Sequence, residues 1–204
     1  TEQIKQGGTR RGANMGILRI DHPDILEFIR AKEQEGEFNN FNLSVGITEA
    51  FMQAVEQDRD YALVTPASGK EQGRLNAREV FNLLVDKAWQ SGDPGIIFLD
   101  RINRDNPTPA QGEIESTNPC GEQPLLPYEA CNLGSLNIAH TMDSPDFGRT
   151  VETAIRGLTA VSDMSHIRSV PSIEAGNAAS HAIGLGQMNL HGYLAREGIA
   201  YGSP

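Results

Sequence analysis

The chain has 204 residues, of which 38% are hydrophobic and 22% charged, and its formal net charge is −10. These proportions are typical of a soluble globular domain with one core. The acidic balance argues against nucleic-acid binding, which needs a concentrated basic face. No apolar run approaches the roughly 20 residues of a membrane-spanning helix, and no secretion signal is recognised. Two cysteines and five histidines without paired spacing predict neither a disulfide framework nor a metal site, and they favour a reducing, cytoplasmic setting.

The first half of the chain alternates predicted strands and helices. Hydrophobic periodicity predicts strands at 15–20, 42–47, 61–65 and 95–99, and helices that begin near Pro23, Thr48 and Asn76. Thr48 is the expected N-cap of its helix, and Asn76 with Glu79 is a variant of the capping box. The strand at 61–65 is expected outside the main sheet or at its edge, and 66–74 is predicted to be a loop.

Two apolar segments are expected to be deeply buried. The helix that follows Asn76 carries a strongly apolar set of side chains: Val80, Phe81, Leu84, Val85, Ala88 and Trp89. The run at 96–98 is continuously apolar, which is the pattern of a strand covered on both faces.

The second half repeats the alternation after a long irregular segment at 106–127, whose length indicates a functional loop. A strand is predicted at 133–138, a helix over 151–161, a strand at 182–185 and a closing helix from Met188. Strands that alternate with helices predict parallel pairing and an α/β fold.

The irregular segment contains the sequence Asn-Pro-Cys-Gly-Glu at 118–122. If this stretch is extended, Asn118, Cys120 and Glu122 point to the same face. An amide, a thiol and a carboxylate together can orient a hydroxyl, act as nucleophile or radical carrier, and accept a proton. The alternative is a surface turn with an incidental cysteine, since these are ordinary turn residues.

This motif, followed by Cys-Asn-Leu-Gly-Ser-Leu-Asn at 131–137, resembles the active-site finger loop of the ribonucleotide reductase large subunit. Residues 6–13 resemble the loop of that family that reports the allosteric effector to the substrate base. Residues 183–186 open a further segment typical of the family. The resemblance therefore runs the length of the chain.

The resemblance implies part of a ten-stranded α/β barrel, built from two five-stranded halves with the finger loop through its middle. Residues 1–105 would supply strands and helices before the finger, 106–131 the finger loop, and 132–204 strands and helices after it. The chain opens inside a functional loop and ends at the start of a connection, so we expect it to be a piece of a longer protein.

The resemblance also implies roles for four residues. Cys120 would be the thiyl radical that takes hydrogen from the ribose 3′ carbon. Glu122 would accept the 3′-hydroxyl proton, and Asn118 would orient the ribose hydroxyls and Glu122. Cys131 would be one of two cysteines that provide reducing equivalents, and its partner, upstream in the family, is absent here.

The loop near the N-terminus is the expected effector and substrate loop. Its residues are Gln6, Gly7, Gly8, Arg10 and Arg11, where glycines permit unusual backbone conformations and arginine can bind phosphate or base. The alternative is a basic glycine-rich turn. A dinucleotide-binding interpretation of 184–189 fails because its third glycine and an acidic partner are missing.

The two parts of the chain resemble different classes. Residues 1 to about 130 resemble the adenosylcobalamin-dependent reductases, and residues from about 132 to 204 resemble the class Ib diphosphate reductase large subunit, which predicts a hybrid. The first part predicts adenosylcobalamin as cofactor; the alternative is no bound cofactor, with the radical supplied by a dimetal small subunit.

The expected partners are a ribonucleoside di- or triphosphate, a nucleotide effector, a thioredoxin- or glutaredoxin-type reductant and the remainder of the barrel. A homodimer or a radical-generating subunit would complete the assembly. Two other functions stay open: an inactive nucleotide-binding barrel fragment, and another thiyl- or glycyl-radical barrel enzyme. No glycyl-radical motif is seen, and the Arg10 loop favours the reductase.

Overall fold

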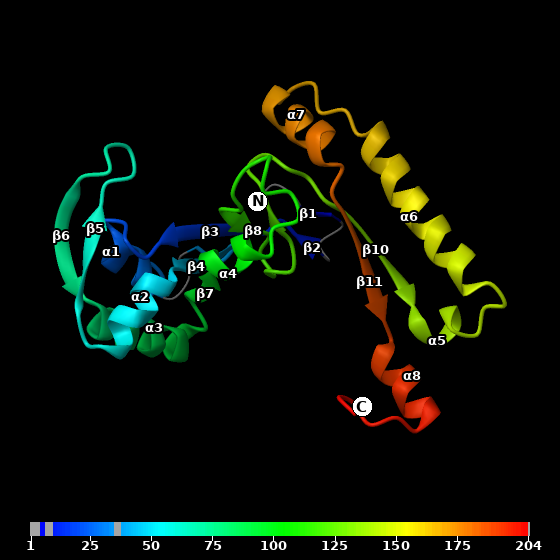
Figure 1. Ribbon diagram of the computed structural model, residues 1–204, viewed down its shortest axis with the longest axis horizontal. Coiled ribbons are helices and arrows are strands. Elements are labelled where there is room, and N and C mark those ends of the chain that lie inside the picture. Colours follow the sequence, from blue (N-terminus) through cyan, green and yellow to red (C-terminus); the bar gives the residue numbers. More distant parts are fainter. Residues whose placement is uncertain (1–4, 7–9, 35–37, 204) are drawn as a thin grey trace. The chain divides into compact units, whose positions relative to one another are not determined.

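The computed structural model describes residues 5–6, 10–34 and 38–203. The chain divides into two compact units, Thr1–Leu126 and Pro127–Pro204, which are considered separately below (Figure 1). None of the described helices has both the length and the hydropathy of a membrane span.

The first unit is built on a parallel sheet of three strands in the order β3-β4-β7. They are β3 (Asn14–Arg19), β4 (Phe41–Ile47) and β7 (Gly95–Phe98). Ser44 at the middle of the sheet lies opposite Ile17 of β3 and Gly95 of β7. Predicted strands at 15–20, 42–47 and 95–99 are thus confirmed to within one residue at most boundaries.

Three helices cover this sheet: α1 (Ile25–Ile29), α2 (Glu49–Glu56) and α3 (Ala77–Ser91), with α3 in contact with both of the others (Figure 1). Their apolar faces and the central strand form one core, whose buried members are Ile20, Ile25, Ile29, Val45, Ile47, Phe51, Val55, Leu63, Ala77, Val80 and Leu84. Burial of these side chains is the main stabilising contribution to the unit.

The predicted helix caps are confirmed. The Thr48 hydroxyl accepts a hydrogen bond from the Phe51 amide at 3.2 Å, and the Asn76 side chain accepts one from the Glu79 amide at 3.0 Å. Each cap satisfies an amide that has no partner within its helix. Helix α3 ends at Gly92, whose φ of +83° is the left-handed conformation that glycine adopts readily.

The strand β5 (Asp60–Val64) lies outside the main sheet, as predicted, and pairs with β6 (Glu71–Asn76) as an antiparallel hairpin. The prediction of a loop over 66–74 is therefore wrong from Glu71 onward. Leu75 is the one large apolar residue of β6 and packs against the core, so the strand lacks the repeated alternation that marks a strand with one buried face.

The expected burial of the apolar helix and strand is corrected in two places. Trp89 is 87% exposed and Val85 50% exposed, because only one side of α3 meets the core. Ile96 is 38% exposed because β7 is an edge strand, paired only with β4 among the described residues. The strand is followed directly by α4 (Leu99–Arg104), a helix that the sequence analysis did not predict.

The segment at 106–127 is irregular except for a short hairpin of β8 (Ser116–Thr117) and β9 (Pro124–Leu125). A second small hairpin near the N-terminus pairs β1 (Lys5–Gln6) with β2 (Arg10–Arg11). The six residues between β8 and β9 carry the predicted catalytic motif.

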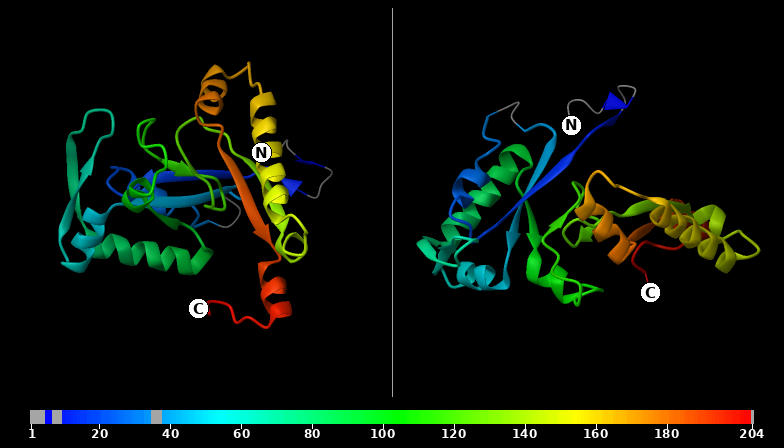
Figure 2. Two further views of the ribbon diagram at one scale, coloured as in Figure 1. Left: turned by 45° about the vertical axis from the view of Figure 1, so that its right-hand side comes forward. Right: turned by 90° about the horizontal axis from the view of Figure 1, so that it is seen from above.

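The second unit contains two parallel strands, β10 (Asn132–Asn137) and β11 (Ile183–Met188), paired in register from end to end. Four helices accompany them: α5 (Ile138–Thr141), α6 (Phe147–Met164), α7 (Pro171–Ser180) and α8 (Leu190–Glu197). Helix α6 lies along both strands (Figure 2). The sequence analysis predicted α6 and α8 but not α5 or α7.

Buried side chains in the described part of the second unit are polar. Ser162 and Asn177 exchange two hydrogen bonds of 3.2 Å and join α6 to α7, and Thr141 is the third. Large apolar side chains such as Val161 and Met164 are exposed. The described strands thus form a mixed α/β fold with parallel sheets but no closed barrel.

Candidate active site

The predicted catalytic motif forms a β-turn. The Gly121 amide donates to the Asn118 carbonyl at 3.0 Å, with Pro119 and Cys120 as the two central residues. Cys120 has no positive φ, which excludes a type II turn, and Asn, Pro and Gly occupy positions that type I turns favour. The expectation of an extended stretch is therefore wrong, because the turn preference of Pro119 and Gly121 overrides the strand pattern.

The Asn118 side chain holds this turn closed. Its Oδ1 atom accepts a hydrogen bond from the Gln123 amide at 3.0 Å, and the Thr117 hydroxyl donates to the Asn118 carbonyl at 3.0 Å. No described residue accepts a hydrogen bond from the two N–H donors of the Asn118 side chain, so they can serve a ligand. Asn118 is thus both part of the turn and a potential hydroxyl-orienting group.

Asn118, Cys120 and Glu122 lie within five consecutive residues of the turn segment. The Cys120 thiol is free and exposed at the apex of the turn. The Glu122 carboxylate is exposed as well. Cys131 is a free thiol of the second unit, directly before β10, and is partly buried. Burial raises the pKa of the Cys131 thiol above its ordinary value, and the nearby Glu129 carboxylate raises it further.

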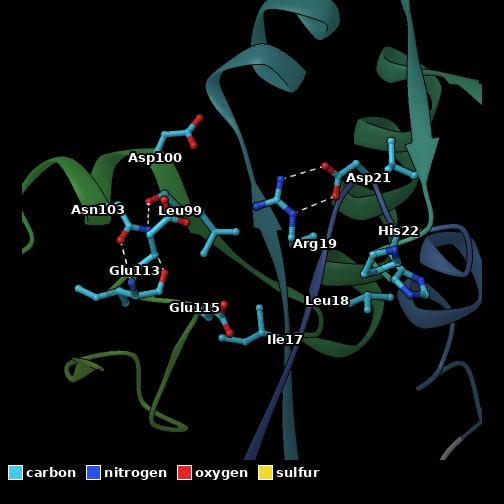
Figure 3. A pocket seen from close by; sticks show the side chains of 13 residues that line it. Ile17, Leu18, Arg19, Asp21, His22, Leu99, Asp100, Asn103, Glu113 and Glu115 are labelled. Carbon is cyan, nitrogen blue, oxygen red and sulfur yellow. Dashed lines mark hydrogen bonds and ion pairs between the residues drawn. The ribbon is translucent and has the colours of Figure 1, made fainter. Parts of the chain in front are cut away.

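Two asparagines from other elements attach the finger segment to the rest of the first unit. Asn42 of β4 donates from Nδ2 to the Pro119 carbonyl at 2.7 Å, across 77 residues of sequence. Asn103 of α4 binds both backbone groups of Ile114: its Oδ1 accepts from the Ile114 amide at 2.7 Å and its Nδ2 donates to the Ile114 carbonyl at 2.9 Å (Figure 3). Sequence reasoning missed both residues.

The predicted effector loop is described in part. Strands β1 and β2 pair antiparallel, so Gln6 lies opposite Arg10 and Lys5 opposite Arg11 along the backbone. This pairing places the two predicted contact residues, Gln6 and Arg10, on facing strands. Gly7 and Gly8 lie outside the described residues.

A cavity of about 630 Å³ adjoins the finger hairpin. Thr117, Gly121 and Pro124 of the finger line it on one side, and apolar residues of β7 and α4 line the other. Its lining is mainly apolar, with Arg101 and Asp105 as the charged members. Where a ligand reaches this cavity, the finger backbone would form one of its walls.

A second cavity, of about 590 Å³, lies at the carboxyl ends of β3 and β7 (Figure 3). Arg19 and Asp21 form a two-bond ion pair there, with N–O distances of 2.9 and 3.1 Å, and this pair raises the pKa of the Arg19 guanidinium. None of the predicted catalytic residues lines this second cavity. Asn42, which contacts the finger turn, lies at the opposite, amino end of β4.

No group of three or more His, Cys, Asp or Glu side chains in the described ranges is placed to hold a metal ion. The chemical groups of the finger turn are a thiol, a carboxylate and an amide, which suit hydrogen-atom and proton transfer.

Comparison with known proteins gives a consistent family. A family model described as ribonucleotide reductase, barrel domain, matches residues 1–204. The chain is 49% identical over 210 residues to a vitamin B12-dependent ribonucleoside-diphosphate reductase of Thermoplasma acidophilum. This match covers 100% of the chain and 27% of that protein. A vitamin B12-dependent ribonucleoside-diphosphate reductase of Mycobacterium tuberculosis is 47% identical, over 98% of the chain and 30% of its own length.

A more distant relative is the ribonucleoside-diphosphate reductase subunit alpha of Mycoplasma pneumoniae, 33% identical over 98% of the chain and 34% of its own length. The chain thus spans about three tenths of the length of these relatives. Because the family model covers every residue, the chain belongs to the ribonucleotide reductase barrel domain family.

Proposed function

We propose that this chain is the central part of the catalytic barrel of a ribonucleotide reductase that converts ribonucleoside diphosphates to 2′-deoxyribonucleotides. The observation that carries the proposal is the exposed Cys120 thiol at the apex of a hydrogen-bonded turn, flanked by the Asn118 amide and the Glu122 carboxylate. The names of the similar proteins support a diphosphate substrate.

In this proposal Cys120 begins the reaction. Its thiol loses a hydrogen atom to the radical source, and the resulting thiyl radical takes the hydrogen atom from the ribose 3′ carbon. Glu122 accepts the 3′-hydroxyl proton, while the free N–H donors of Asn118 orient the ribose hydroxyls. The same Cys120 returns a hydrogen atom to the 3′ carbon at the end, so it is regenerated.

Cys131 supplies half of the reducing equivalents. The 2′-hydroxyl leaves as water, two thiols are oxidised to one disulfide, and the 2′ carbon gains hydrogen. An ordinary cysteine is mainly a thiol near neutral pH, and the upward shift of the Cys131 pKa favours that form further, so the thiol can give the proton that the departing hydroxyl needs. Its partner cysteine would come from the remainder of the protein, and a dithiol protein of the thioredoxin or glutaredoxin type would reduce the disulfide again.

The β1–β2 hairpin is the proposed link between a nucleotide effector and the substrate base. The backbone pairing of Gln6 with Arg10 supports this role, because it places these two residues opposite each other on neighbouring strands.

The radical source is proposed to be adenosylcobalamin, as the names of two similar proteins suggest. The exposure of Cys120 at the apex of its turn fits a radical delivered by direct contact. When bound, adenosylcobalamin supplies a radical that abstracts hydrogen, and Cys120 is the residue of this chain that would meet it. The division of the chain into two classes near residue 132 stays a hypothesis, since relatives of both kinds match 98% or more of its length.

The test uses the full-length parent enzyme with adenosylcobalamin, effector and dithiol but no second subunit. We expect deoxynucleotide formation by the wild type. Product that forms only after a radical-generating subunit is added would reverse the assignment of the radical source.

Two serine variants test the roles of the thiols. A hydroxyl hydrogen is far harder to abstract than a thiol hydrogen, so Cys120→Ser should abolish the first hydrogen abstraction. Cys131→Ser should permit abstraction but block completed reduction. Full steady-state rates in both variants would show that this turn is not the active site.

A further inference from the structure

The finger hairpin is too small to hold its own turn in place. Strands β8 and β9 share only two residue pairs, Ser116 with Leu125 and Thr117 with Pro124. Isolated two-stranded hairpins, even longer ones, are marginally stable in water. The position of the turn must therefore be set by contacts with the sheet behind it.

The contact that reaches the turn itself comes from Asn42. This residue is the second of β4, and its backbone position is fixed by pairing opposite Met15 of β3. From this fixed point its Nδ2 atom donates to the Pro119 carbonyl at 2.7 Å. A paired strand of the sheet thus carries the donor, and the turn carries the acceptor.

The accepting carbonyl belongs to the peptide bond that directly precedes Cys120. Because a peptide unit is planar, holding its carbonyl oxygen also fixes the direction of the bond to the Cys120 α-carbon. The internal bond from the Gly121 amide to the Asn118 carbonyl fixes the other side of the same turn. Cys120 is thereby held between one anchor inside the turn and one on the sheet.

We propose that Asn42 is a positioning residue for the reaction: its hydrogen bond to the Pro119 carbonyl sets the place from which the Cys120 sulfur transfers a hydrogen atom. This inference rests on the proposed function of Cys120. Hydrogen transfer requires contact between the reacting atoms, and a misplacement of about 1 Å lowers a rate on the order of 100-fold. Asn42 itself touches neither substrate nor reacting atoms in this role.

The side chain of Asn42 is exposed, so its removal leaves no cavity and no buried polar group in the core. Its effect on the reaction can therefore be separated from a general loss of stability. Asn76 is the control away from the finger: its side chain accepts a hydrogen bond from the Glu79 amide at 3.0 Å and donates one to the Asp58 carboxylate at 3.1 Å.

The experiment measures steady-state kinetics of the full-length parent enzyme carrying Asn42→Ala, Asn42→Asp or Asn76→Ala. Asn42→Asp preserves the size of the side chain but removes the donor, and it provides a second variant if the alanine protein does not fold. We expect both Asn42 variants to lower kcat about 100-fold with KM changed less than about threefold. Asn76→Ala should retain kcat.

Hydrogen exchange of the same proteins gives a readout independent of activity. The Gly121 and Gln123 amides are held by bonds within the turn, and their exchange should be about fivefold faster in the Asn42 variants, the factor that corresponds to one net hydrogen bond. Asn76→Ala should leave these amides unchanged.

The inference is overturned if kcat of either Asn42 variant stays within about threefold of wild type, or if Asn76→Ala lowers kcat equally. These results differ from a failure of the proposed function. If the proposed function were wrong, Cys120→Ser would remain active. If only the positioning role of Asn42 were wrong, Cys120→Ser would be inactive and the Asn42 variants would be active.

Discussion

Substitution of Asn103 by alanine should destabilise the first unit more than its partial exposure suggests. Its side chain makes both hydrogen bonds of a strand partner to Ile114, at 2.7 and 2.9 Å, and Ile114 is only 6% exposed. Asn103→Ala leaves a buried amide and a buried carbonyl without these partners. An unsatisfied buried group costs about 1–3 kcal/mol and two such groups are left, so we expect a loss of about 2–6 kcal/mol in unfolding free energy.

The assay is urea unfolding followed by circular dichroism, since the exposed Trp89 is a poor fluorescence reporter. Asn106→Ala is the control, because Asn106 lies in the same segment and also bonds two backbone groups, the Thr108 amide at 2.9 Å and the Gly112 carbonyl at 3.0 Å. Those partners are more open to water, so the control should lose less than about 1 kcal/mol. Equal losses for the two variants, within about 0.5 kcal/mol, would refute the argument that burial of Ile114 sets the cost.

Three further predictions follow from local environments. Burial and Glu129 raise the pKa of Cys131, so iodoacetamide should alkylate it more slowly than a free cysteine near pH 8, and the rate should rise at more alkaline pH. Glu129→Gln should accelerate the alkylation, and an unchanged rate would contradict the role of Glu129. The Tyr61 hydroxyl is buried without a hydrogen bond in the described structure, while its ring packs edge-on against Phe51 with 5.0 Å between the ring centroids. Tyr61→Phe should therefore leave the unfolding free energy equal or raise it by up to about 1 kcal/mol, and a clear loss would reveal a missed partner. The 204-residue chain alone should not reduce nucleotides, and more than one deoxynucleotide formed per chain, with effector and dithiol present, would disprove this.

The parts of the fold that the sequence predicts are those with local signals. The caps at Thr48 and Asn76 are chemical features within four residues of their helices, and they form as expected. Strand β6 and helix α7 were not predicted because neither carries a repeated apolar pattern: β6 has a single large apolar residue, Leu75, and α7 is rich in alanine, serine and glycine. Periodicity indicates an element only where one face is buried.

The candidate site can be divided in the same way. The identities of Asn118, Cys120 and Glu122 single out the motif, but their alternating spacing favoured an extended stretch where Pro119 and Gly121 make a turn. Asn42 gives no sequence signal, because its partner carbonyl is 77 residues away and belongs to the backbone, which every residue possesses. Supporting residues of this kind become visible only in three dimensions.

The two cysteines depend on different kinds of support. Cys120 belongs to a unit with its own apolar core, and the hydrogen bond from Asn42 to the Pro119 carbonyl holds its turn to that unit. Cys131 precedes β10 in a unit whose described buried side chains are all polar, while Leu133 of the same strand is 56% exposed. Apolar burial is the main stabilising contribution to a folded unit, so the second unit needs further apolar cover, whereas the unit that carries Cys120 has its own core. Partial loss of that cover should therefore disturb the surroundings of Cys131 before it disturbs the turn that carries Cys120.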